Sequence, residues 1–156
     1  TNNDSVASLA AQFRVGQLVP NAGVFAGGGI FQTVVLDPGR VLLSVDIATS
    51  AEGINLSAGL FQLIFDGVVV AEHDFGMINA NTSEFGVLSH VTDVTAGAHD
   101  FRIQMGRTFL SGCGRGCTPA QFVDNARITP VPETASFPIL LTLGIAGLAA
   151  FRLSNL

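Results

Sequence analysis

Three histidines are the first residues whose side chains could bind a metal ion or transfer a proton. His73, His90 and His99 each fall in or beside a strand-like segment, and none has a second ligand at helical spacing. The sequence contains neither an H-E-x-x-H metal motif nor a G-x-S-x-G nucleophile motif. His73 and Asp74 are adjacent, so a strand would point them to opposite faces. We therefore predict that the protein is not an enzyme.

Acidic side chains are the second group that could do chemistry, as proton donors or cation ligands. No two of them are singled out as the carboxylate pair of a glycosidase: Asp46, Glu52, Asp66, Glu72, Asp74, Glu84, Asp93, Asp100 and Asp124. Solvated faces and turn caps account for them more simply. Asp124 and Asn125 supply the oxygen ligands that Ca²⁺ prefers, and they form a candidate Ca²⁺ site at the edge of a sheet. No other cofactor is predicted.

The two cysteines are close together, in the segment Cys113-Gly114-Arg115-Gly116-Cys117. An even count with glycine spacers is typical of a small disulfide loop in an oxidising compartment. The loop-entropy model gives about 2 kcal/mol for so short a ring. A pair of free thiols is the alternative reading. A zinc site is disfavoured, because it needs about four ligands.

Composition narrows the class of protein further. The chain has 156 residues, of which 48% are hydrophobic and 12% charged, and its net charge is −5. Low charge with high hydrophobicity disfavours disorder. No basic run exists, so nucleic-acid binding is not predicted. The chain has twelve Phe but no Trp or Tyr. Sugar sites commonly use Trp or Tyr, but Phe can also stack on a sugar.

Short alternating apolar segments separated by turn signals predict an all-β domain over residues 1–129. Val41, Leu43, Val45 and Ile47 alternate with more polar positions, as in a half-buried strand. Asp66-Gly67 between two apolar runs predicts a hairpin. We expect strands at 12–19, 30–36, 41–48, 60–65, 68–75, 84–94, 98–105 and 121–129, and a loop at 20–29. Regular short strands favour a jelly-roll-like antiparallel β-sandwich.

The composition changes at Pro130. Residues 130–136 contain two prolines and predict a stiff linker. Residues 137–156 form a hydrophobic tail: Phe137 to Phe151 carry no charge and Arg152 follows. As a helix, this uncharged run would be about 22 Å long, shorter than a bilayer core of about 30 Å. We favour a C-terminal membrane helix over the alternative, a buried helix or strand of the domain.

The C-terminal end resembles the PEP-CTERM sorting signal of Gram-negative bacteria. The resemblance is carried by Val131-Pro132-Glu133, by the apolar run Leu143 to Phe151 and by Arg152. Thr134 replaces the usual second proline, and one arginine stands where several are usual. The resemblance implies export, recognition by an exosortase and an extracellular or cell-surface destination. Arg152 would remain on the cytoplasmic side of the inner membrane.

Two strand segments, 63–70 and 123–128, also look like those of carbohydrate-binding-module domains in such proteins. Two functional hypotheses follow. The first is a structural cell-surface or matrix protein that forms a homopolymer, with Ser5 to Val19 pairing with a neighbour's sheet edge. The alternative is a carbohydrate-binding module that binds exopolysaccharide.

Overall fold

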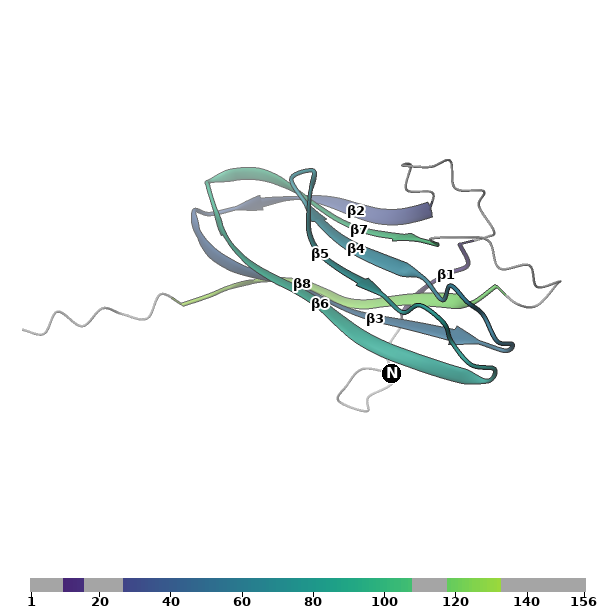
Figure 1. Cartoon of the computed structure of the whole chain (residues 1–156). Helices are drawn as coiled ribbons and strands as arrows, with labels where there is room; N and C mark the ends of the chain where they lie inside the picture. The colour runs from purple at the N-terminus through teal and green to yellow at the C-terminus, as the bar shows by residue number, and fades with distance from the viewer. Residues whose placement is uncertain (1–9, 16–26, 108–117, 133–156) are drawn as a thin grey trace, which may run out of the picture.

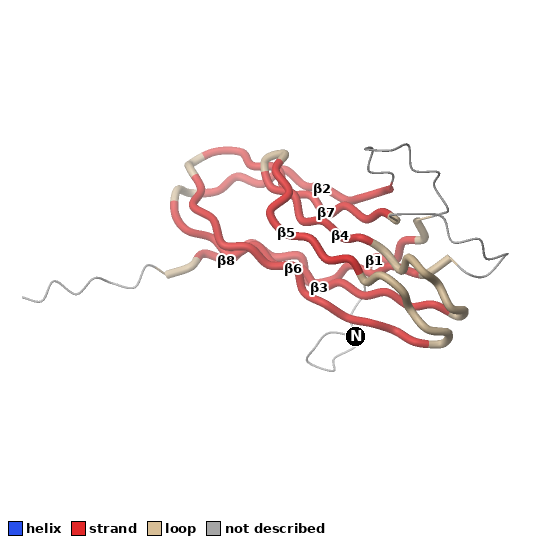
Figure 2. Tube along the Cα trace, in the orientation of Figure 1, coloured by secondary structure: helices blue, strands red, loops and turns tan. Residues whose placement is uncertain are grey.

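Eight β-strands in two facing layers make up the part of the chain that the structure describes (Figures 1 and 2). A computed structural model describes residues 10–15, 27–107 and 118–132. The strands are β1 (Ala11–Phe13), β2 (Gly27–Leu36), β3 (Gly39–Ala51), β4 (Leu60–Phe65), β5 (Val68–Asp74), β6 (Thr82–Val94), β7 (Gly97–Gly106) and β8 (Ala120–Pro130). Within those residues, no helix is long and apolar enough to cross a bilayer.

The strand order is that of a jelly roll. Sheet A has the order β1-β8-β3-β6 and sheet B the order β2-β7-β4-β5, and all the pairs are antiparallel. Strands that follow one another along the chain therefore mostly alternate between the two sheets. Figure 1 shows sheet B above sheet A. The buried hydrophobic cluster contains residues from both sheets. The predicted jelly-roll-like sandwich is confirmed.

Strand β3 shows why this sequence forms a sandwich. Its inward side chains Val41, Leu43, Val45 and Ile47 are buried, while the residues between them are partly exposed. β3 pairs along its whole length with β6 and along most of it with β8. The predicted strand is confirmed, and it continues to Ala51, past its predicted end. The extension is stabilised because Thr49 is buried and its hydroxyl donates to the Ala58 carbonyl at 3.1 Å.

The predicted Asp66-Gly67 hairpin is also present. Asp66 and Gly67 have φ angles of 48° and 80° and join β4 to β5. Asp and Gly accept this left-handed backbone at low cost, which explains why the dipeptide signals a tight turn.

The segment Gly27-Gly28-Gly29 corrects the sequence-based prediction. It was expected in a loop, but it begins β2 and pairs with the end of β7. A Cβ atom at Gly29 would lie 2.5 Å from the Ile103 carbonyl oxygen, whereas a Cβ at Gly28 would meet nothing within 4 Å. Glycine is therefore needed at position 29, because the backbones of β2 and β7 approach closely there. A glycine within a strand can mark such a close approach.

Strand β8 contains an irregularity that the sequence pattern hints at. Val123 is buried and Ile128 packs against the core, yet the two positions are out of phase for a regular strand. The register against β3 shifts between Ser44 and Asp46, and Asn125 has a φ of 50°. A β-bulge at Asn125 resets the alternation, so both ends of β8 keep their apolar side chains inward.

At the N-terminal end, the strand predicted over 12–19 is described only as far as Val15, and within these residues β1 ends at Phe13. Gln121 explains the end of β1, because its buried side-chain oxygen accepts from the Val15 backbone nitrogen at 3.1 Å. That bond takes the place of a strand-to-strand bond. The rest of Ser5 to Val19, the cysteine segment and the tail from Glu133 lie outside the described residues.

We predict that Gly29→Ala will destabilise the protein more than Gly28→Ala. The added methyl group at 29 must displace the β7 backbone, and overpacking of this kind costs about 1–3 kcal/mol. Thermal and urea unfolding of the two variants would measure the difference. Equal stability would contradict the close approach, because the substitutions are chemically identical and one residue apart.

Candidate functional site

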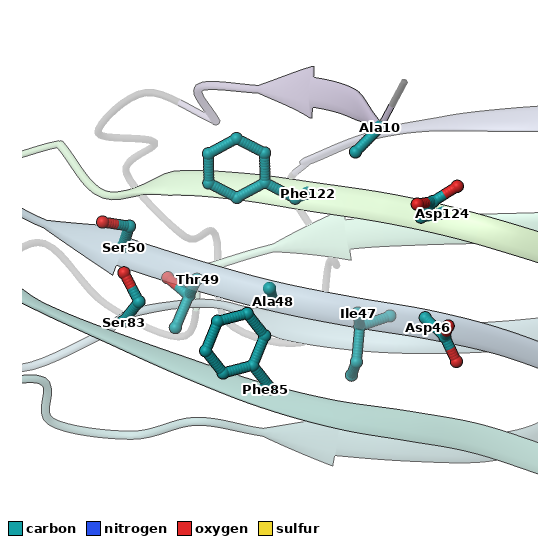
Figure 3. A pocket seen from close by; sticks show the side chains of 10 residues that line it. All are labelled: Ala10, Asp46, Ile47, Ala48, Thr49, Ser50, Ser83, Phe85, Phe122 and Asp124. Atoms are coloured by element: carbon teal, nitrogen blue, oxygen red, sulfur yellow. The ribbon is translucent and has the colours of Figure 1, made fainter. Parts of the chain in front are cut away.

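A groove of about 250 Å³ lies on the outer face of sheet A, over β3 and its two neighbouring strands (Figure 3). Strand geometry places every second side chain of each strand on this face. The side chains of β3 that face outward here are Asp46, Ala48 and Ser50, which alternate with the core residues. The same strand therefore builds both the core and the groove floor.

Two phenyl rings flank the small floor residue Ala48. Ala48 is the register partner of Phe85 on β6 and of Phe122 on β8. Directly paired residues point to the same face of a sheet, and Figure 3 shows the two rings on opposite sides of Ala48. The backbones of β6 and β8 are two strand spacings apart, about 9.6 Å. A ligand that contacts both rings must span β3.

Phe85 presents a large apolar side chain to solvent, because 66% of its surface is exposed. Phe122 is half-buried. A ligand covering the two rings would remove apolar surface from water, which is favourable by roughly 25 cal/mol per Å². The centre of the groove is therefore an exposed apolar surface.

One end of the groove is acidic. Asp46 and Asp124 are register partners on β3 and β8, one outward position along from Ala48 and Phe122. The bulged residue Asn125 connects them: its side-chain nitrogen donates to Asp46 Oδ2 at 2.8 Å, and its backbone nitrogen donates to Asp124 Oδ1 at 2.8 Å. The bulge thus fixes the arrangement of both carboxylates.

The other end of the groove carries hydroxyl groups. Ser50 and Ser83 are register partners on β3 and β6 and both line the groove, on the far side of the rings from the carboxylates (Figure 3). The groove thus has an apolar centre and polar groups at each end. This pattern suits an amphiphilic ligand that presents an apolar surface together with hydroxyl or amine groups.

The predicted candidate residues are partly brought together here. Asp124 and Asn125 are neighbours in β8, and the structure places Asp46 beside them. The Ca²⁺ site remains a prediction. Of the sorting residues, Val131 continues from β8 and its nitrogen donates to the Arg40 carbonyl at 2.8 Å, and the exposed Pro132 follows. Glu133, Arg152, Cys113 and Cys117 lie outside the described residues.

His99 is hydrogen-bonded to Asp66 and Thr95, far from the groove. Its Nδ1 is 2.7 Å from Asp66 Oδ2 and its Nε2 is 2.9 Å from the Thr95 carbonyl oxygen. Both partner atoms are acceptors, so both ring nitrogens donate to them when the ring is protonated. The imidazole ring of His99 also stacks on the phenyl ring of Phe65, and the two ring centroids are 5.3 Å apart. The hydrogen bond with Asp66 is the main cause that raises the pKa of His99 and lowers the pKa of Asp66.

Sequence reasoning missed Phe85, Phe122 and Ala48 as a group. A usable signal exists in the predicted strand 84–94, where Phe85 falls on the same phase as Ser89 and Asp93, the solvent-facing phase. A phenylalanine on that phase is a candidate contact residue. The pairing of β6 and β8 with β3, which brings the two rings together, cannot be read from the sequence.

Comparison with known proteins identifies shared architecture. No family model and no curated protein sequence matches the chain. Among solved structures, it is similar to the C-terminal domain of EclA, a sugar-binding protein, with a TM-score of 0.52 and 17% identity over 80% of this chain and 79% of that one. A family 35 carbohydrate-binding module from an environmental isolate matches with a TM-score of 0.37 and 13% identity, over 80% of this chain and 93% of that one. At 17% identity the likeness to the EclA domain concerns the fold alone.

We predict that the His99–Asp66 pair makes stability depend on pH. His99 has a raised pKa, so its contribution is complete below the ordinary value of 6.5 and is lost as the pH rises through the folded-state pKa. Asp66 has a lowered pKa, so its contribution is complete above 3.8 and is lost as the pH falls through the folded-state pKa. The pair therefore stabilises most between about pH 4 and 6.5.

The free energy of unfolding in urea, measured from pH 4 to 9, should fall above pH 6.5, and Asp66→Asn should remove most of that fall. Asp37→Asn, at an exposed position in the β2–β3 turn, is the matched control and should retain it. An unchanged pH profile in Asp66→Asn would contradict the assignment.

Proposed function

We propose that this protein is a non-catalytic carbohydrate-binding domain whose ligand occupies the groove over β3. The observation that carries the proposal is the placement of Phe85 and Phe122 on either side of Ala48, between a carboxylate end and a hydroxyl end. This arrangement matches the two-sided chemistry of a sugar. Its C–H surface packs on aromatic rings, and its hydroxyl groups donate to carboxylates or exchange hydrogen bonds with serines.

The size and openness of the site support a short stretch of glycan. Small-molecule pockets enclose roughly 300–1,000 Å³, so a groove of about 250 Å³ lies just below that range. Its floor is a β-sheet, which is a rigid support for contact residues. The shared sandwich fold of a solved sugar-binding domain adds a precedent for the scaffold, while the groove itself is the basis of the proposal.

We also propose that the protein is exported and held at the surface or in the extracellular matrix of a Gram-negative bacterium. The support is the sequence resemblance of Val131-Pro132-Glu133 and of the apolar run ending at Arg152 to a sorting signal. An exosortase-type enzyme and the inner membrane would then be its processing partners. A glycan-binding domain in that location would contact exopolysaccharide.

A structural role as a self-assembling subunit is a second candidate, favoured by the edge of sheet B. Strand β2 is an edge strand of ten residues, and it contains no charged residue and no proline. Natural edge strands usually carry charged residues or prolines, which prevent pairing with strands of other chains. The opposite edge, β5, has Glu72 and Asp74 and pairs across a bulge. Thus β2 is the edge best suited to adding a strand from another copy.

The carbohydrate proposal predicts that Phe85→Ala and Phe122→Ala will each weaken glycan binding by about tenfold. Aromatic contacts contribute about 0.5–1.5 kcal/mol beyond burial, and 1.4 kcal/mol is tenfold in affinity. Affinity electrophoresis against soluble β-glucan, xylan, galactomannan and glycol chitosan would find the ligand, and calorimetry with its oligosaccharide would measure the change.

Phe31→Ala is the control for both groove variants, because Phe31 is 72% exposed but lies on sheet B. Its affinity should equal that of the unmodified protein. A ligand bound equally well by all three variants would show that the groove is not the site.

The assembly candidate predicts that the full chain associates and that Val35→Lys on β2 shifts it towards monomer. A lysine on an edge strand opposes pairing with a second strand. Val68→Lys on β5 is the control, since both valines are exposed edge residues. Sedimentation velocity would measure the species. The edge is not an assembly surface if Val35→Lys leaves the distribution unchanged.

A further inference from the structure

The free side of β2 is the sheet edge, in the described part of the chain, that is long, regular and uncharged. Among the described strands, β2 pairs only with β7, and its ten residues include no charged residue and no proline. At the other edges, β1 has three residues, the pairing of β5 with β4 is interrupted by a bulge, and β6 carries Glu84 and Asp93. An unbroken antiparallel strand therefore fits β2 best.

Two exposed apolar side chains lie on one face of this edge. Phe31 and Val35 are 72% and 83% exposed, and residues four apart in a strand point to the same face. Phe31 is held on its β7 side, because the Arg102 guanidinium carbon is 5.7 Å from its ring centroid. Between the two, the Thr33 hydroxyl donates to Asp100 Oδ1 at 2.7 Å, so it needs no partner from another strand. An apolar neighbour would remove both exposed side chains from water.

A second copy of β2 supplies such a neighbour when the two strands run antiparallel with Thr33 opposite Thr33. In this register, Phe31 of each copy lies opposite Val35 of the other copy. An aromatic residue opposite a β-branched residue is a favourable cross-strand pair. On the other face of the sheet, Ile30 of each copy lies opposite Leu36 of the other. Each face of the edge is therefore complementary to itself.

The neighbouring registers are less complementary. A twofold axis normal to the sheet keeps the same face of both strands on one side, so one residue must lie opposite its own copy. Moving this centre from Thr33 one residue towards the N-terminus sets Val35 against Gly29, which has no side chain to pack. Moving it one residue towards the C-terminus sets Phe31 against the charged Asp37, which follows β2. The register centred on Thr33 covers both apolar residues.

The N-terminal segment of a neighbouring copy fits the β2 edge less well as a partner strand. The described part of that segment contains β1, which pairs with β8 of the same copy. The Val15 nitrogen also donates to the Gln121 side chain. Transfer to another copy would break these bonds, whereas β2 already has the extended backbone that strand pairing requires.

We infer that this protein forms a closed dimer in which β2 pairs antiparallel with β2 of a second copy, with Thr33 at the twofold axis. The inference rests on the assembly candidate proposed above and names its partner strand. The pairing joins the four-stranded sheet B of each copy into one continuous sheet. Both copies use the same edge, so no β2 edge remains for a third copy. Assembly through β2 therefore stops at two copies and forms no filament.

Cysteine crosslinking tests the partner strand and the register together. The full chain carries Cys113→Ser and Cys117→Ser, and Thr33→Cys then sets two thiols opposite each other at the axis. Directly opposite residues have Cβ atoms about 4.5–5.5 Å apart, which a short bifunctional thiol reagent bridges. We expect the reagent to shift Thr33→Cys from the monomer mass of 16.2 kDa to twice that value on a denaturing gel. Thermal unfolding would check that each variant folds.

Val35→Cys and Phe31→Cys are the matched register controls on the same strand. Neither should crosslink alone, because like residues at these positions are offset by four residues, about 14 Å along the strand. A mixture of the two variants should crosslink, since the proposed register sets one position against the other. The dimer should also exchange subunits, so mixing before the reagent is added is sufficient.

The outcomes distinguish this inference from the assembly candidate and from the carbohydrate site. If sedimentation shows association but Thr33→Cys does not crosslink, the chain assembles by another surface and the inference is wrong. Equal crosslinking of Thr33→Cys and Val35→Cys, each alone, would also overturn it, because contact would then be independent of register. A chain that is monomeric at every concentration would remove both assembly proposals. The groove lies on sheet A, so none of these results alters the affinity of one groove for an oligosaccharide.

Discussion

The period-two alternation of β3 is the constraint on which both the core and the groove depend. The strand is central in sheet A, and its inward residues Val41, Leu43, Val45 and Ile47 are almost completely buried. Its outward residues form the floor between two aromatic rings. A slip of one residue in register would move every side chain to the opposite face. It would place Asp46 in the core and an isoleucine in the groove, so the packing that stabilises the fold also fixes the shape of the groove.

Much of the fold could be predicted, because its signals are local. The alternation in β3 and the Asp66-Gly67 turn each occupy a few consecutive residues. The beginning of β2 could not be predicted, because Gly27 to Gly29 look like a loop until β7 is known to approach them. The groove is harder still. Ala48, Phe85 and Phe122 belong to three strands far apart in the sequence, and only the pairing of β6 and β8 with β3 joins them.

The bulge in β8 shows how one irregular position can organise the core and the groove together. With Asn125 in a left-handed conformation, Val123 and Ile128 both turn towards the core although their spacing is wrong for a regular strand. The same residue donates to both carboxylates of the groove. A regular strand would lose one of these roles. The sequence pattern signalled the irregularity as an imperfect phase, but it did not reveal the hydrogen bonds made by Asn125.

The pairing of Pro130 with Val41 sets the direction from which the domain can be tethered. The first residue of β8, Ala120, pairs with Ser50 at the serine end of the groove. The last residue of β8 lies beside the beginning of β3, where the Val131 nitrogen donates to the Arg40 carbonyl. Seven residues separate Asp124 from Val131, roughly 23 Å of extended strand. A tether at the C-terminal end would thus hold the far pole of the sandwich. The two rings lie further still from that end, on the outer face of sheet A, so attachment there would leave them uncovered.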